Sequence, residues 1–365
     1  MQMSDDNDVA VFDIGGTCFR SALWHNGAGL RCIKRCPAIN YLNTAHDDPL
    51  ELQLGLVEHV ITEFDRLACQ SSALVSVASL SLGAPVDVRS GLVLKSGPLW
   101  GPASKPFDLF AALRQRRPEI SWIIANDITA ALFRYVNEIQ GQPCARLLLV
   151  TVSTGIGARL YDYHRQAIPV DAVNGIQGEI GHIPVEAVFR GRRISYRCDC
   201  GGESHLNACS SGRAIGSLLR ELPHLAFETL NGSALGSAYC SGDETDESRH
   251  TTFRSAVAAG DALALEVLDF LTRPLARMFA TILTHDPLVD AIVLTGGVVD
   301  ALGSRYVESL NQQFIEYDMF QVTKADPNYL RRRLRVAPPD DQGGLIGAGY
   351  IALAAASGRK IYAFV

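Results

Sequence analysis

The chain has 365 residues, which is enough for about two domains that each bury a hydrophobic core. Hydrophobic residues make up 47% and charged residues 20%, the ordinary balance of a globular protein. The formal net charge of -6 excludes a general attraction to nucleic acid or anionic membranes. No apolar run approaches the roughly 20 residues that cross a bilayer. The nine cysteines are scattered and odd in number, and the sequence does not start with a signal-peptide pattern. We therefore expect free thiols and a cytoplasmic location.

The first predicted element is a β-hairpin. An apolar strand pattern at 9–12 leads into Asp13-Ile14-Gly15-Gly16-Thr17, and a second strand pattern follows at 18–24. Glycines allow backbone N–H groups to approach phosphate oxygens, and Thr17 adds a hydroxyl donor. An Asp beside a phosphate requires a divalent cation between them, so this turn predicts a Mg²⁺ site. The alternative is a plain tight hairpin in which Asp13 only forms the turn.

The next segment alternates helices with strands. An amphipathic helix is predicted from Asp48 to about Cys69, followed by a strand at 74–82. A loop at 95–101 carries Trp100, which looks exposed and suits a sugar ring, although a lone Trp in a loop is more often a packing anchor. Another helix is expected at 108–116.

A buried strand at 122–125 delivers Asn126-Asp127 to the start of a helix at 128–137. In an open α/β sheet, ligands bind at this end of the strands. Either residue is suited to cap the helix. If Asn126 is the cap, Asp127 is left to accept a proton from a hydroxyl group.

A second strand, glycine turn and strand follow at 147–152, Ser153-Thr154-Gly155-Ile156-Gly157 and 158–161. This repeats the pattern around Asp13. We interpret the two patterns as phosphate-binding hairpins that face each other across a cleft.

The stretch Gly178-Glu179-Ile180-Gly181-His182, then Cys198-Asp199-Cys200, then His205-Leu206-Asn207 has the composition of a metal site. Two cysteines and two histidines are the ligands that a closed tetrahedral zinc site uses. Cys209 is an alternative fourth ligand to His205. A structural zinc here would hold two loops together and orient Glu179, His182 and Asn207 toward one pocket. We expect the basic residues at 190–193 to form a solvated loop.

The C-terminal part is mostly helical. Helices are expected at 210–222, within 253–284 and at 302–317, with a surface loop at 231–248. A strand at 291–294 leads into Thr295-Gly296-Gly297-Val298, where bare backbone would accommodate adenine and ribose. After residues 334–336, a final helix is expected to run to Ala356, and its four glycines, at positions 343, 344, 347 and 349, permit close packing.

The ordered set of motifs at 13–17, 126–127, 153–157, 178–182, 198–201 and 295–297 resembles the ROK family over nearly the whole chain. That family contains sugar kinases and repressors of the actin/Hsp70/hexokinase superfamily. The resemblance implies a two-lobed α/β actin/hexokinase-like (ribonuclease H-like) fold, with ATP and a sugar in the cleft between the lobes. We expect residues 1–125 plus 340–365 in the small lobe and 126–339 in the large lobe. A homodimer is expected by the same analogy.

The resemblance also implies roles for residues. Asp127 would be the catalytic base, while Asn126, Glu179 and His182 would bind the sugar and His182 would ligate zinc with Cys198 and Cys200. Phosphoryl transfer has a loose transition state, so an ordinary carboxylate suffices for a proton that leaves late. The two glycine turns with Mg²⁺ would supply positioning and charge stabilisation. ATP is the expected donor and polyphosphate the alternative.

The chain departs from the family at the substrate pocket. His205 and Asn207 stand where the family usually has a third Cys and a Glu that binds hydroxyls at the reducing end of the sugar. Asn keeps its hydrogen-bonding groups but carries no charge. Ala84, also expected at the pocket edge, replaces a usual Gly, and Ser96 replaces a frequent Asn.

We expect an ATP-dependent kinase for the primary hydroxyl of a glucose-like hexose. A C7-cyclitol or an amino sugar of secondary metabolism is the serious alternative, given the altered pocket. A sugar-sensing transcription factor is disfavoured because only twelve residues precede Asp13, fewer than a helix-turn-helix domain needs. A non-catalytic sugar-sensing protein is disfavoured as well, because it would not need the base Asp127, which is present.

Overall fold

The computed structural model describes residues 8–41, 44, 48–94, 96–101, 103–236, 245–340 and 342–365. The chain divides into two compact units. Unit 1 comprises Met1–Pro143, Arg159–Gln177 and Asp340–Val365, and unit 2 comprises Cys144–Ala158 and Gly178–Pro339. Residues 126–143 and 159–177, which we expected in the large lobe, belong to unit 1 in this division.

The difference has a packing reason. Helix α4 (Asp127–Glu138) packs against the C-terminal helix α13 (Gly343–Ala356). Strand β8 (Ile168–Val170) pairs in parallel with the C-terminal strand β13 (Tyr362–Phe364). Both segments are therefore held by the chain's C-terminal residues, which the sequence already places in the small lobe.

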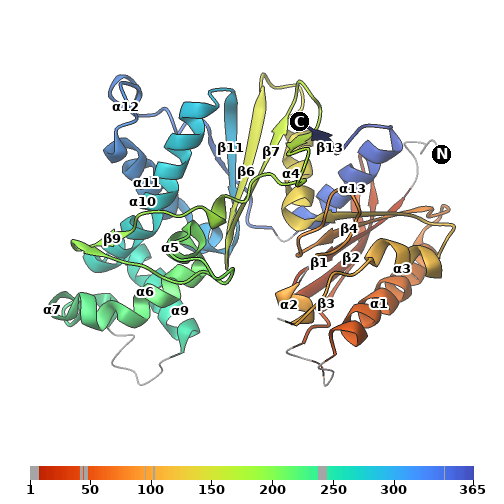
Figure 1. The fold of residues 1–365 in the computed structure, drawn as a ribbon, viewed down its shortest axis with the longest axis horizontal. Helices are drawn as coiled ribbons and strands as arrows, with labels where there is room; N and C mark the ends of the chain where they lie inside the picture. The colour runs from red at the N-terminus through yellow and green to blue at the C-terminus, as the bar shows by residue number, and fades with distance from the viewer. Residues whose placement is uncertain are drawn as a thin grey trace. The chain divides into compact units, whose positions relative to one another are not determined.

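Unit 1 is built on a five-stranded sheet in the order β3-β2-β1-β4-β5 (Figure 1). Strand β1 pairs antiparallel with β2 and parallel with β4, and β4 is parallel to β5. The predicted hairpin around Asp13 is thereby confirmed. The strands of this sheet are β1 (Val9–Ile14), β2 (Cys18–His25), β3 (Gly29–Pro37), β4 (Val77–Leu82) and β5 (Ser121–Asn126). The helices that precede α4 are α1 (Pro49–Gln70), α2 (Gly97–Trp100) and α3 (Leu109–Arg116).

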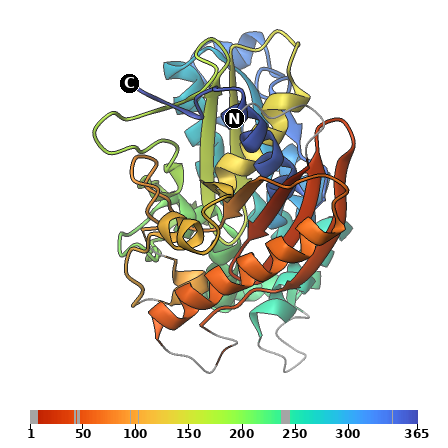
Figure 2. The same ribbon diagram turned by 90° about the vertical axis from the view of Figure 1, so that its right-hand side faces the viewer.

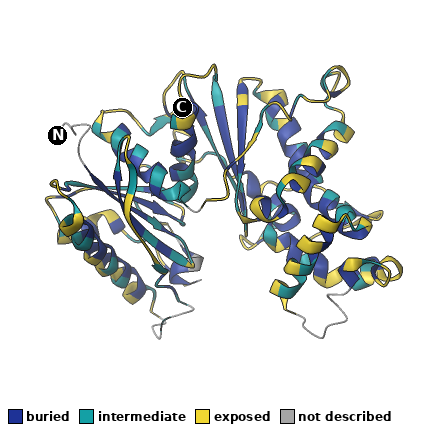
Figure 3. Cartoon of the chain, turned by 180° about the vertical axis from the view of Figure 1, so that it is seen from behind, coloured by how far each residue is buried: buried dark blue, intermediate teal, exposed yellow. Residues whose placement is uncertain are grey.

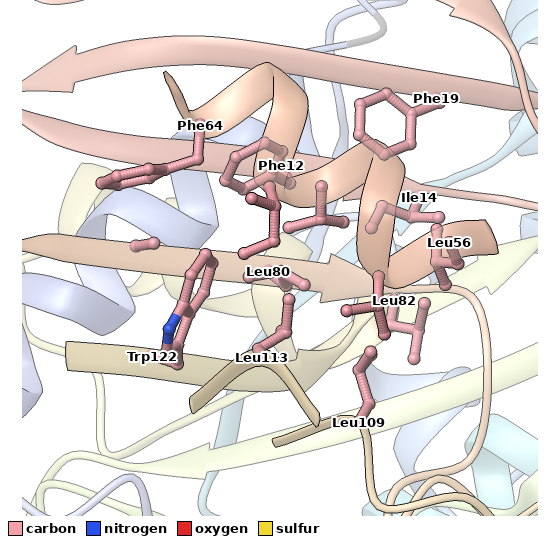
Figure 4. Packing of buried hydrophobic residues seen from close by; sticks show 14 of the residues in the cluster. Phe12, Ile14, Phe19, Leu56, Phe64, Leu80, Leu82, Leu109, Leu113 and Trp122 are labelled. Carbon is pink, nitrogen blue, oxygen red and sulfur yellow. The ribbon is translucent and has the colours of Figure 1, made fainter. Parts of the chain in front are cut away.

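Alternation along β1 builds a core on each face of this sheet. Phe12 and Ile14 join the cluster that packs under α1 and α3, which Figure 4 shows from close by. Val9 and Val11 point to the opposite face and pack against α13. Figure 2 shows α1 lying across its face of the sheet. Trp100, which looks exposed from sequence, is 1% exposed and belongs to the first cluster, so it is a packing anchor.

Unit 2 contains a four-stranded sheet in the order β12-β11-β6-β7, whose two central strands, β11 and β6, are largely buried (Figure 3). Its β-elements are β6 (Arg146–Val152), β7 (Ile156–Asp162, ending in unit 1), β9 (Val188–Phe189), β10 (Arg192–Arg193), β11 (Val289–Thr295) and β12 (Leu334–Val336). Its helical elements are η1 (Ile180–His182), α5 (Leu206–Ser210), α6 (Gly212–Leu225), α7 (Phe227–Leu230), η2 (Ala234–Gly236), α9 (Asp246–Ala259), α10 (Ala262–His285), α11 (Gly297–Tyr317) and α12 (Val322–Ala325).

Two loop expectations need correction. The basic segment at 190–193 is solvated but closes a short antiparallel hairpin of β9 and β10, and Arg190 forms an ion pair with Glu266. The expected loop at 231–248 contains α7's cap, η2 and the first residues of α9, while its central part lies outside the described residues. Among the described residues, none of the helices combines the length and hydropathy needed to span a membrane.

Candidate functional site

The carboxylate expected to act as base lies at the carboxyl end of β5 in unit 1. Asn126 is the N-cap of α4: its side-chain oxygen accepts a hydrogen bond from the N–H of Ile128 at 3.0 Å. Asp127 accepts from the same N–H at 2.8 Å. Asn126 also donates its amide hydrogen to the carbonyl oxygen of Ala84 at 3.1 Å. The cap therefore ties the end of β5 to the turn that follows β4.

The ends of β1, β4 and β5 bring Asp13 toward Asp127, because these three strands are parallel and adjacent. Burial, followed by the negative charge of Asp13, raises the pKa of Asp127 to about 6, while the Ile128 N–H and the charge of Arg159 oppose the rise. A carboxylate with this pKa is a better proton acceptor than an ordinary Asp and is still charged at neutral pH.

Asp13 itself is fixed by two side chains of the same sheet. Arg20, its cross-strand neighbour on β2, donates to one carboxylate oxygen at 2.8 Å, and Ser81 donates to the other at 2.7 Å. The following turn is closed by a Gly15 N–H bond to the Cys18 carbonyl at 2.9 Å. Thr17 is exposed at this turn. Asp13 and Asp127 supply carboxylate oxygens, which are the ligands that suit Mg²⁺.

A cavity of about 730 Å³ in unit 2 contains the second glycine turn. Ser153 and Thr154 line it together with Gly297, as the motif positions predict. Gly296 has φ 107°, and a Cβ there would lie 2.5 Å from the Val152 carbonyl oxygen, so only glycine fits between β11 and β6. Gly157, in contrast, lies within strand β7 and outside the turn.

Two helices begin at this cavity. Gly212 and Arg213 at the start of α6 line it, as do Gly297 and Val298 at the start of α11. Neither helix has a side-chain cap, and the Gly212 N–H donates to the carbonyl oxygen of Ser153, so the N–H groups of the next residues in these first turns are oriented for a ligand. Two helix N-termini, with their partial positive charge, and a glycine turn favour a phosphate-bearing ligand of nucleotide size.

The predicted metal ligands also come together in unit 2. One ligand atom each from His182, Cys198, Cys200 and His205 lies within 4.8 Å of the others. The sulfur of Cys198 is 3.7 Å from Nδ1 of His182, and the sulfur of Cys200 is 3.2 Å from Nδ1 of His205. Zn–S bonds of about 2.3 Å and Zn–N bonds of about 2.0 Å give similar separations at a tetrahedral ion. Cys209 is fully buried and outside this group.

Asn207 and Glu179 flank the ligand group. The side-chain oxygen of Asn207 accepts a hydrogen bond from the backbone N–H of Ile156, directly after the glycine turn. Asn207 therefore connects the start of α5 to the Ser153–Gly155 turn. Glu179 precedes η1 and is exposed, and the N–H of His182 donates to its carbonyl oxygen at 3.1 Å.

Sequence reasoning missed several residues of these sites. Arg20 and Ser81 hold Asp13, and the α9 residues Asp246, His250 and Arg254 line the cavity with Arg213. The spacing of the three α9 residues, four apart along one helix face, is a signal that the sequence does carry. The rest depend on which strands and helices become neighbours.

Comparisons with known proteins agree with these motifs. The ROK family model matches residues 9–355. The 2-epi-5-epi-valiolone 7-kinase of an Actinoplanes species is 35% identical over 97% of this chain and 95% of its own length. The C(7)-cyclitol 7-kinase of Streptomyces hygroscopicus subsp. jinggangensis is 30% identical over 95% of this chain and 94% of its own length.

A solved structure supports the architecture. The ROK family glucokinase of Streptomyces griseus, crystallised with glucose and AMPPNP, superposes with a TM-score of 0.67 at 18% identity and covers 95% of this chain and 99% of that one. The fold is thus the two-lobed α/β fold of actin/hexokinase type that the sequence predicts. On the match to the family model and the identity to these relatives, the chain belongs to the ROK family.

Proposed function

We propose that this protein transfers the γ-phosphoryl group of ATP to the primary hydroxyl of a C7-cyclitol. It is an ATP-dependent kinase of the sugar-kinase class, a phosphotransferase with an alcohol group as acceptor. The cyclitol is the proposed part. In such a molecule six carbons form the ring and the seventh carries a primary hydroxyl outside it.

The neutral side chain at Asn207 is the observation that favours a cyclitol as the acceptor. The family resemblance places at this position a Glu that binds hydroxyls at the reducing end of a sugar. Here the residue is neutral, and its oxygen accepts the N–H of Ile156. A carbocyclic ring has no reducing end, so it needs no carboxylate there. The cyclitol kinases that match this chain over at least 95% of its length support the same choice.

Asp127 is the proposed base. Its pKa of about 6 leaves it charged at neutral pH, and Asn126 orients it from the cap position. Asn126, Glu179, His182, Asn207 and Ala84 are the residues that we propose for binding the acceptor. Since the transition state is loose, Asp127 needs only to orient the hydroxyl and take its proton late.

The unit 2 cavity is the proposed nucleotide site. We propose that Ser153, Thr154, Gly296 and Gly297 hold the phosphates and nucleoside, and that Asp13, Gly15, Gly16 and Thr17 of unit 1 are further phosphate-binding residues. A cavity of about 730 Å³ favours ATP over polyphosphate as donor, because a linear phosphate chain does not need a pocket of that volume. Mg²⁺ would be held by Asp13 and would neutralise charge on the phosphates.

Measuring ADP release with MgATP and a panel of acceptors tests the proposal. We expect kcat/KM for 2-epi-5-epi-valiolone to exceed that for glucose and N-acetylglucosamine by about tenfold or more, a difference of about 1.4 kcal/mol in transition-state binding. The Asp127→Asn variant serves as the blank for ATP hydrolysis. A higher kcat/KM for glucose would make the protein a hexose kinase, and a release rate equal to the blank with every acceptor would contradict the proposal.

A further inference from the structure

Arg213 is a charged residue of the unit 2 cavity that no motif assigns. It is the second residue of α6, and its neighbours on the cavity wall include Ser153 and Thr154. Its guanidinium group forms an ion pair with Asp199. Asp199 lies between Cys198 and Cys200, so this ion pair links the cavity to the loop of the proposed zinc ligands.

The start of α6 is fixed against the glycine turn. The N–H of Gly212 donates to the carbonyl oxygen of Ser153 at 2.7 Å. A Cβ at position 212 would lie 2.9 Å from the same oxygen, so a larger residue would separate the two segments. Arg213 is therefore held one residue away from the turn that we propose for phosphate binding.

The ion pair of Arg213 is weak enough to be exchanged. The side chains are 47% and 68% exposed, and solvent-exposed pairs of this kind contribute little to stability. A phosphate chain carries more charge than one carboxylate and accepts two parallel hydrogen bonds from a guanidinium group. Inside a cavity with two helix N-termini, the phosphate is the stronger partner.

The other charged residues of the cavity do not offer an equivalent group. Asp246 and Glu247 on α9 are acidic and would repel a phosphate. Asp246 already accepts from Arg220 at 2.6 Å. Arg254 also lines the cavity, but from α9 and not from the helix that contacts Ser153.

We propose that Arg213 binds the phosphate chain of the nucleotide and that it gives up Asp199 in doing so. This inference rests on the proposed nucleotide site. Nucleotide binding then leaves Asp199 without its cation and removes the ion pair between the Cys198–Cys200 loop and α6, while the bond from Tyr196 to Glu221 on α6 remains. Arg213 thus binds phosphate directly. Its ion pair with Asp199 also couples nucleotide binding to the loop that contains the proposed zinc ligands.

Calorimetric titration of three variants with ADP and Mg²⁺, and with adenosine, tests the exchange. Arg213→Met is expected to raise the Kd for ADP about tenfold or more, the effect of losing a charge-assisted contact, and to leave the Kd for adenosine unchanged. Asp199→Asn frees Arg213 in the unliganded protein and is expected to lower the Kd for ADP two- to fivefold.

Arg305→Met is the matched control. Arg305 lies on α11, is also 47% exposed and also pairs with an acid, Glu308, but it does not line the cavity. We expect its Kd for ADP to equal that of the wild type. Zinc content should be unchanged in all three variants, which separates phosphate binding from damage to the metal site.

The outcomes distinguish this inference from the proposed function. If the wild type binds ADP and Arg213→Met binds it equally well, the role of Arg213 is wrong and the nucleotide site stands. An equal loss for adenosine, or an unchanged Kd in Asp199→Asn, contradicts the exchange. A wild type that binds neither ADP nor ATP contradicts the proposed function itself.

Discussion

The charged form of Asp127 lowers the stability of the folded protein. Burial and the nearby Asp13 raise its pKa from 3.8 to about 6. Because the folded pKa lies above the unfolded value, the protein loses stability as pH rises from about 4 to about 6, and the full cost is present above that range. The shift corresponds to about 3 kcal/mol. Such a cost is typical of a residue retained for chemistry and not for stability.

Asp127→Asn is expected to abolish phosphoryl transfer and to stabilise the protein. The Asn oxygen can still accept the Ile128 N–H, but the buried charge is removed. We expect the free energy of unfolding in urea at pH 8 to rise by about 1–2 kcal/mol, less than the full shift because the favourable charge at the helix start is lost as well. The gain should disappear near pH 4, where the wild-type carboxyl group is protonated too.

Asp246→Asn is the control for this measurement. Asp246 also stands in the first turn of a helix, but Arg220 lowers the pKa of its carboxyl group, so its charge stabilises the folded state. This variant should show no gain at pH 8. Normal turnover by Asp127→Asn would remove Asp127 from the mechanism, and equal stability of that variant and the wild type at pH 8 would mean that its charge carries no cost.

Helix α13 positions the two carboxylates of unit 1. It packs on α4, which begins at Asp127, and a Cβ on Gly344 would lie 2.3 Å from the Asp13 carboxylate. Its glycines give it the close approach that the sequence predicts. The backbone of α13 therefore contacts Asp13 directly and supports Asp127 through its packing on α4.

Gly347→Ala tests this packing. The new Cβ would lie 1.7 Å from the backbone carbonyl oxygen of Ala130, so α13 and α4 must separate. We expect a loss of about 3 kcal/mol or more in the free energy of unfolding. Gly343→Ala is the matched control, because its Cβ would meet only the end of Arg134 at 3.9 Å and should change stability by less than about 1 kcal/mol. Equal effects of the two substitutions would contradict the packing account.

The loops around Cys198 and Cys200 present a small set of zinc ligands. Cys198→Ser is expected to lose the metal and to weaken acceptor binding, because Asn207 and η1 would no longer be held in place. Elemental analysis should find about one zinc per chain in the wild type and less than about a tenth of that in the variant. Cys209→Ala should keep the metal, since Cys209 lies outside the ligand group. Zinc-free wild type, or loss of zinc in Cys209→Ala, would contradict the assignment of His205 as the fourth ligand.

The two units carry different parts of the proposed reaction. Unit 1 holds the proposed base and the Asp13 turn, and unit 2 holds the cavity, the second glycine turn and the proposed zinc ligands. The five-stranded sheet lies in unit 1, and the four-stranded sheet lies in unit 2 except for the end of β7.

Local signals in the sequence predicted most of the elements. Asp48 caps α1 and Asp108 caps α3, at the residues where the sequence predicts these helices to begin. The hairpin around Asp13 follows from two strand patterns and a glycine turn. These features depend on residues a few positions apart, so their physical cause is contained in a short segment. The order of such motifs also sufficed to indicate the family.

The packing of distant segments decided the rest. The burial of Trp100, the raised pKa of Asp127 and the ion pair of Arg213 with Asp199 each depend on elements that meet only after folding. The segments 126–143 and 159–177 joined unit 1 for the same reason, through α13 and β13. Desolvation and long-range charge are properties of the assembled protein, and no spacing along the chain encodes them directly.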